Sequence, residues 1–248
     1  MYKSALISSF LIVALSGCVS DSATRKDMDV NKASQLYADL GLAYLQQGDT
    51  ERAQAKLKKA LELNKRNAQA HHYIAEVYKN LDDPEFAEKH YKASLKLDTQ
   101  DAMVLNNYGA FLCGESRFSD AETYFLQAAT VHRYKTPELA YENVALCAMR
   151  SAMPDKAMEY FRRALSIKPD MPKSLFNMAQ VSYNIGEALK ARAFIQRLHT
   201  VTPKTESSLA LAIQVEAAIG DQVAVAKYKS ELAAMTSPVD SQDVGAAE

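Results

Sequence analysis

The chain has 248 residues, of which 48% are hydrophobic and 24% charged, and its formal net charge is −1. This composition is that of one ordinary domain or one repeat array. The net charge is near zero and no block of like charge occurs, so the charge distribution gives no support for nucleic-acid binding. With only 8 glycines and 7 prolines, helix breakers are scarce, which predicts an all-α fold.

Residues 1–17 have the features of a secretory signal peptide. Lys3 precedes an almost unbroken apolar run over residues 5–15, and small residues follow it. A basic start, about a dozen apolar residues and a small-residue cleavage site are typical of an exported protein. The run is too short for a transmembrane helix, which needs roughly 20 apolar residues. The alternative, a buried N-terminal helix, is disfavoured because polar residues follow directly.

The sequence Leu-Ser-Gly-Cys at residues 15–18 resembles the bacterial lipobox. The resemblance implies that Cys18 is acylated and becomes the mature N-terminus, and several acyl chains on one residue anchor a protein stably. Val19 rather than aspartate follows the cysteine. By resemblance to Gram-negative lipoproteins, this favours export to the periplasmic face of the outer membrane.

Residues 18–33 are expected to be a lipidated N-terminus and a flexible tether. Residues 19–33 are polar and lack a helical pattern of apolar residues. At about 3.5 Å per residue, such a tether could hold the folded part tens of ångströms from the membrane.

The rest of the chain repeats with a period of about 34 residues. Leu40-Gly41 and Tyr44 begin a pattern in which a small residue opens the second helix of each unit, and a large residue follows four positions later. The small residues, at intervals of 34, 34, 36 and 34, are Ala53, Ala87, Ala121, Ala157 and Ala191. The large ones are Leu57, Tyr91, Phe125, Phe161 and Ile195. The period and pattern resemble the tetratricopeptide repeat.

This resemblance implies a right-handed superhelical solenoid of six helix-turn-helix repeats, in which stacking neighbours bury each apolar face. The repeats are expected at 34–67, 68–101, 102–135, 138–171, 172–205 and 206–239. The sixth repeat is degenerate, since Val225 replaces the alanine and Lys229 the large residue. Residues 240–248 are expected to be a disordered tail.

The sequence contains no recognisable catalytic or metal-binding constellation. His71 and His72 are adjacent, so on a helix they point about 100° apart and cannot share a metal ion. No cysteine lies in a C-x-x-C pair, and no nucleotide-binding or hydrolase motif is present. We therefore expect no enzymatic activity, no cofactor, no metal and no small-molecule substrate.

Protein binding is the expected activity. In tetratricopeptide proteins the first helix of each repeat lines a concave groove. Carried onto this sequence, the apolar groove positions suit an amphipathic or extended peptide, unless the tether or the tail covers them. They are Ala38, Leu42, Leu45, Leu146, Met149, Phe176 and Tyr183.

Two further cysteines, Cys113 and Cys147, lie on the first helices of neighbouring repeats. Adjacent helix axes are roughly 8–10 Å apart, and a disulfide needs Cα atoms within about 7 Å. A disulfide is therefore possible in the oxidising periplasm. The alternative is two buried thiols that pack as small apolar groups.

Three segments are more specific than the generic repeat: N-N-Y-G-A-F-L-C at 106–113, E-N-V-A-L-C at 142–147 and Y-F-R-R-A-L at 160–165. Together with the lipobox, they resemble the type IV pilus biogenesis and stability lipoproteins, although the family usually has glycine where Ala145 stands. Those lipoproteins are pilotins, which help the pilus secretin reach and assemble in the outer membrane. The resemblance implies a secretin subunit as partner. An adaptor for cell-wall hydrolases or outer-membrane protein assembly is the alternative, and an enzyme whose site no motif reveals is a third reading.

Overall fold

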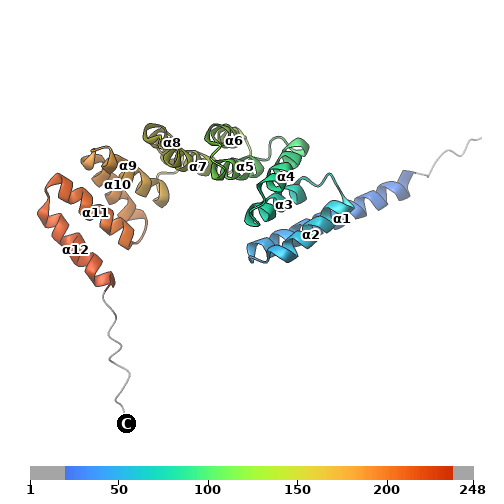
Figure 1. Cartoon of the computed structure of the whole chain (residues 1–248), viewed down its shortest axis with the longest axis horizontal. Coiled ribbons are helices and arrows are strands. Elements are labelled where there is room, and N and C mark those ends of the chain that lie inside the picture. Colours follow the sequence, from blue (N-terminus) through green and yellow to red (C-terminus); the bar gives the residue numbers. More distant parts are fainter. Residues whose placement is uncertain (1–19, 237–248) are drawn as a thin grey trace, which may run out of the picture. The chain divides into compact units, whose positions relative to one another are not determined.

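A computed structural model of the protein describes residues 20–236, and these contain twelve α-helices and no strand. The all-α prediction is therefore confirmed. The chain divides into two compact units between Leu97 and Asp98 (Figure 1). Residues 1–19 and 237–248, with the predicted signal peptide, Cys18 and the tail, lie outside the described part. No helix within residues 20–236 is long and apolar enough to cross a membrane.

The first unit contains two helical hairpins. Helix α1 (Ser20–Gln46) packs against α2 (Thr50–Leu63), and α3 (Ala68–Asn80) packs against α4 (Pro84–Leu97). The start of α1 corrects the sequence prediction, because residues 20–33 are helical and not a flexible tether. With 27 residues, α1 is much longer than the 14-residue α2, and its first part extends beyond its partner (Figure 1). The Asn64 amide at the end of α2 donates a hydrogen bond of 2.8 Å to Asn31.

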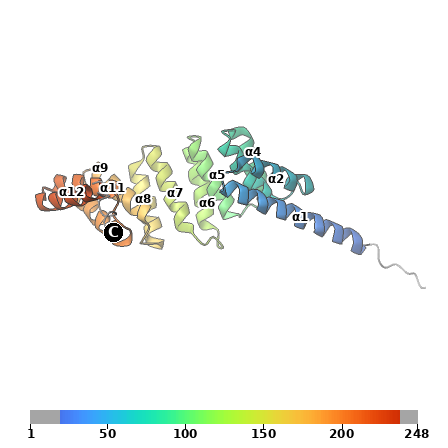
Figure 2. The same cartoon turned by 90° about the horizontal axis from the view of Figure 1, so that it is seen from below.

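The second unit contains four helical hairpins. In chain order the helices are α5 (Ala102–Gly114), α6 (Phe118–Thr130), α7 (Pro137–Arg150), α8 (Pro154–Ile167), α9 (Pro172–Asn184), α10 (Ala188–Val201), α11 (Glu206–Ile219) and α12 (Gln222–Thr236). Helices α5 to α8 lie side by side (Figure 2). The α6–α7 connection has six residues, 131–136, whereas the α8–α9 and α10–α11 connections have four. The interval from Ala121 to Ala157 is 36 residues instead of 34, and the two additional residues lie in this α6–α7 connection.

The turn inside each hairpin has one residue with a left-handed backbone. These residues are Gly48, Asp82, Ser116, Ala152, Gly186 and Gly220, with φ between 56° and 89°. Their spacing of 34, 34, 36, 34 and 34 residues follows the sequence period. Because the sixth hairpin has the same turn, its helices follow the repeat geometry although its sequence is degenerate.

Small residues allow the two helices of each hairpin to approach closely. All five alanines that open the second helices are fully buried, and so are the large residues four positions later. In two repeats the first helix carries glycine at the crossing. A Cβ atom on Gly41 would lie 2.5 Å from Leu57, and one on Gly109 would lie 2.9 Å from Phe125. Glycine at these two positions therefore lets the two helices cross closely.

We expect Gly109→Ala to destabilise the second unit by about 1–2 kcal/mol. The added methyl group overpacks the buried ring of Phe125, and this cost exceeds the roughly 1 kcal/mol that alanine gains over glycine in a helix. Gly114→Ala is the matched control, since it lies on the same helix with no atom within 4 Å of the added Cβ. Urea unfolding should give a lower midpoint for Gly109→Ala alone. Equal midpoints for the two variants would contradict the tight crossing.

Candidate functional site

The described residues include no group of three or more side chains that could hold a metal ion. Two histidines, His71 and His90, lie close together, with their Nδ1 atoms 2.9 Å apart. His71 Nε2 lies 3.1 Å from the Lys65 carbonyl oxygen, which can only accept. His71 therefore donates through Nε2 and accepts from His90 through Nδ1. Burial lowers the pKa of His71, and burial together with His71 and Lys89 lowers the pKa of His90 to about 4. The pair is neutral at pH 7 and joins α3 to α4.

The predicted groove residues of the first unit are less accessible than expected. Ala38 is fully buried, so the prediction that it lines a groove is wrong. Leu42 and Leu45 are half-buried and pack against the core cluster that contains Leu57 and Ile74. Much of their apolar surface is therefore already covered by the unit itself.

The exposed apolar residues of α1 lie on another stripe, which we call the α1 stripe: Met28, Leu36 and Leu40. Their spacing of eight and four residues puts them along one side of the helix. Leu36 is 60% exposed and Leu40 is 38% exposed. This surface was not predicted from the sequence, because Met28 lies in the expected tether and Leu40 in the expected repeat pattern. The i, i+4 spacing of Leu36 and Leu40 was the signal that could have revealed it.

The predicted groove residues of the second unit are all half-buried. Phe176 and Tyr183 pack against a core cluster that includes Ile195 and Val215. Phe176 also lines a cavity of about 300 Å³ with Lys173, Leu198 and Pro203. Met149 and Leu146 are on α7, and Met149 lines a cavity of about 310 Å³ between the α7–α8 turn and α9. The structure therefore places Phe176 and Met149 at two separate cavities.

Hydrogen bonds join the first helices of neighbouring repeats. The Asn143 amide donates a bond of 3.0 Å to Asn106, and the Ser174 hydroxyl donates one of 2.5 Å to Glu142. Both Ser174 and Glu142 are buried. Glu142 is thus used inside the repeat stack, because a buried carboxylate needs a hydrogen-bond donor.

Cys113 and Cys147 are joined by a disulfide, with their Cα atoms 5.9 Å apart. This separation is within the range that a disulfide spans. The bond links α5 to α7, and both cysteines are buried. It closes a covalent loop around the longer connection between the third and fourth repeats.

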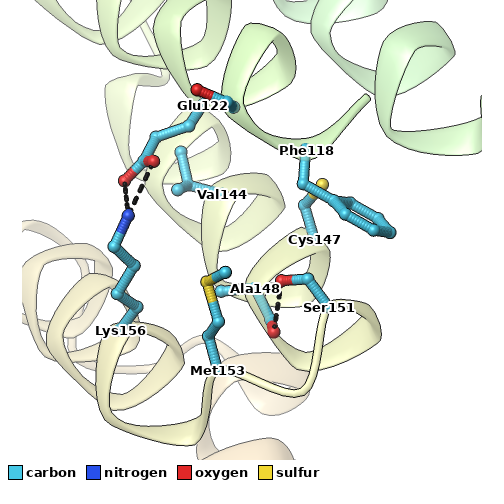
Figure 3. A pocket seen from close by; sticks show the side chains of 9 residues that line it. Phe118, Glu122, Val144, Cys147, Ala148, Ser151, Met153 and Lys156 are labelled. Carbon is cyan, nitrogen blue, oxygen red and sulfur yellow. Dashed lines mark hydrogen bonds and ion pairs between the residues drawn. The ribbon is translucent and has the colours of Figure 1, made fainter. Parts of the chain in front are cut away.

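The side of α7 opposite the predicted groove lines another cavity, of about 220 Å³, between α6, α7 and α8 (Figure 3). Val144, Cys147 and Ala148 of α7 line it and are buried. Phe118 and Met153 are apolar residues near its edge, where α6 and α8 begin.

An ion pair borders this cavity (Figure 3). Lys156 Nζ donates to both carboxylate oxygens of Glu122, at 3.1 and 2.9 Å, and the Tyr160 hydroxyl donates to Oε1 at 2.7 Å. Partial burial alone would raise the pKa of Glu122, but the bonds from Lys156 and Tyr160 outweigh it and lower that pKa. Burial and the bond to Glu122 raise the pKa of Tyr160 to about 12. The carboxylate is therefore charged at pH 7, and its charge is matched within the protein.

Family models agree with the repeat architecture. A model described as TPR repeat matches residues 41–82, and one described as tetratricopeptide repeat matches residues 68–101 and 139–171. The fold class predicted from the sequence is thereby confirmed.

Among proteins of known name, the type IV pilus assembly protein PilF of Pseudomonas aeruginosa is 32% identical over 225 residues, which cover 90% of this chain and 89% of PilF. A solved structure of P. aeruginosa PilF has a TM-score of 0.74 and 31% identity, and the match covers 84% of this chain and 94% of that one. A crystal structure of PilW, described as a widely conserved type IV pilus biogenesis factor, has a TM-score of 0.71 and 26% identity. That match covers 83% of this chain and 95% of PilW. With this identity over almost its whole length, the chain belongs to the tetratricopeptide-repeat family of the type IV pilus assembly protein PilF.

Proposed function

We propose that this protein is an outer-membrane lipoprotein that acts as a pilotin for the type IV pilus secretin. In this role the repeats bind a secretin subunit, and the acyl chains on Cys18 carry both to the outer membrane. The match to PilF over 90% of the chain is the observation that carries the proposal, since it supports a role in type IV pilus biogenesis. The lipobox before Cys18 and Val19 supports the location.

The α1 stripe is the surface that we propose for the secretin. It is exposed and apolar, as a surface that binds an amphipathic segment must be. It also belongs to the repeat nearest in sequence to Cys18. A segment bound there would therefore be held close to the lipid anchor.

Replacing Cys18 with alanine tests the membrane part of the proposal. The variant cannot be acylated, so we expect uncleaved precursor or protein missing from the outer-membrane fraction. Secretin multimers and twitching motility should fall to the level of a strain that lacks the gene. Membrane fractionation, mass spectrometry of the N-terminal peptide and immunoblots of unheated samples provide the measurements. Normal fractionation of the variant, together with an unmodified wild-type Cys18, would rule out the lipid anchor.

Deleting the gene separates the pilotin from the alternative adaptor. A strain that lacks the gene yet retains secretin multimers and pili would exclude the pilotin function. Loss of cell-wall hydrolase activity or of outer-membrane proteins in that strain would then support the adaptor.

A further inference from the structure

The two ends of the helical hairpins in the first unit carry opposite charge. The turns inside the hairpins, residues 48–52 and 79–85, contain five carboxylates and two cations. These are Asp49, Glu51, Asp82, Asp83 and Glu85, with Arg52 and Lys79. The opposite end, formed by residues 29–34 and 58–67, contains five cations and two carboxylates. We call it the basic end, and its charged residues are Lys32, Lys58, Lys59, Lys65 and Arg66, with Asp29 and Glu62.

Most of the cations at the basic end have no acidic partner. All five are exposed. Lys59 forms an ion pair of 3.0 Å with Glu62. Within residues 20–97, no ion pair of 4 Å or less engages the other four cations. Because Asp29 is the one remaining carboxylate at this end, the basic end has an excess of positive charge that an anionic surface would complement.

The basic end is also the end of the unit that lies toward Cys18 along the chain. The hydrogen bond from Asn64 to Asn31 places the end of α2 beside this level of α1, and the first part of α1 extends beyond it (Figure 1). The helix from Ser20 to Asn31 spans about 17 Å, and the link from Ser20 to Cys18 adds at most about 7 Å. An anchor at Cys18 therefore keeps the basic end within about 25 Å of the bilayer.

We propose that the basic end is a docking surface for the anionic phospholipid head groups of the membrane that holds Cys18. Each lysine or arginine close to an anionic membrane favours binding by roughly fivefold. This attraction falls off within about 8 Å at physiological ionic strength. The first part of α1 must therefore lie along the membrane surface and not stand upright on it. The inference rests on the proposed lipid anchor at Cys18, although its test does not require acylation.

An acidic peptide is the other occupant that would complement these cations. The link through Cys18 favours the membrane, because a covalent tether keeps the bilayer at a high effective concentration beside the basic end. The formal net charge of the chain is −1, so the attraction comes from the uneven distribution of charge and orients the first unit.

The test couples the mature chain, through the Cys18 thiol, to a maleimide-headgroup lipid in vesicles. Cys113 and Cys147 are joined to each other, so Cys18 is the thiol that reacts. The sequence has no tryptophan, so one introduced tryptophan reports its own position. Gln69→Trp puts it beside the basic end and Leu81→Trp puts it at the opposite end, both at exposed positions. The vesicles are phosphatidylcholine, alone or in an equimolar mixture with phosphatidylglycerol, and lipid with a spin-labelled head group quenches nearby tryptophan.

The tryptophan of Gln69→Trp should be quenched in the mixed vesicles and not in phosphatidylcholine alone, and high salt should remove the difference. The tryptophan of Leu81→Trp should be quenched in neither. Adding Lys65→Gln and Arg66→Gln should lower the ratio of docked to undocked chains about 25-fold, at roughly fivefold per cation. Arg52→Gln with Lys89→Gln is the matched control, since it removes two exposed cations outside the basic end and should leave the ratio unchanged.

Circular dichroism and the melting temperature establish that each variant is folded. Equal quenching of Gln69→Trp in the two kinds of vesicle would overturn the proposal, and this is also the result expected if the occupant is an acidic peptide. Undiminished docking by a folded Lys65→Gln, Arg66→Gln variant would overturn it as well. Because the anchor in this experiment is synthetic, either failure leaves the acylation of Cys18 to be decided by membrane fractionation.

Discussion

Reducing the disulfide between Cys113 and Cys147 is expected to lower the free energy of unfolding of the second unit by about 3–4 kcal/mol. The bond closes a loop of 34 residues, and the chain-entropy cost of closing such a loop falls in this range. This would lower the melting temperature by about 10 °C, at roughly 2–4 °C per kcal/mol for a unit of this size. Thermal unfolding followed by circular dichroism, with and without reductant, measures the effect.

The double variant Cys113→Ala, Cys147→Ala is the control for this experiment. It removes the bond without leaving thiols, so reductant should no longer change its melting temperature. Alkylation of the unfolded, unreduced wild-type protein should modify neither cysteine. Two modified cysteines under those conditions would show that the residues are free thiols, the alternative that the sequence left open.

The repeat period could be predicted from the sequence because it depends on residue size at a few fixed positions. Two helices cross closely only where both carry small side chains, so Ala53 and its counterparts mark the crossings of the first five repeats. The left-handed turn residues were harder to find, because glycine occupies only three of the six positions and Asp82, Ser116 and Ala152 occupy the others.

The length of α1 could not be predicted in the same way. Amphipathic periodicity appears only where a helix buries one face. Met28, Asn31 and Lys32 are all exposed, so the residues described at 28–32 give little amphipathic pattern. Polar residues on an exposed part of a helix have the same sequence pattern as those of a flexible tether.

The accessibility of the groove could not be predicted either, because it depends on which neighbours cover each side chain. Ala38 occupies a groove position by its number in the repeat, yet it belongs to the core cluster with Tyr73 and Ile74. The cavity beside α7 combines side chains from three helices. No local pattern in the sequence joins Phe118 to Met153.

We expect the double variant Leu36→Glu, Leu40→Glu to reduce secretin multimers in the outer membrane to nearly the level of a strain lacking the gene. Fully burying an exposed leucine contributes roughly 1.5–3 kcal/mol. Leu36 and Leu40 have 60% and 38% of their surface left to bury, so losing both contacts weakens binding by at least about tenfold. Because both side chains are exposed, the variant should melt within a few degrees of the wild type. The multimers are measured on immunoblots of unheated membranes, together with twitching motility.

Two comparison variants make this result specific to the α1 stripe. Leu189→Glu introduces one glutamate at a residue of the second unit that is still more exposed, and it should leave secretin multimers unchanged. Leu42→Glu, Leu45→Glu alters side chains that pack against the core, so it should lower the melting temperature as well as the multimers. A Leu36→Glu, Leu40→Glu protein that supports multimers and twitching at wild-type level would place the secretin elsewhere on the repeats. It would leave the Cys18→Ala and gene-deletion experiments to decide whether the protein is a pilotin at all, because those do not depend on which surface binds.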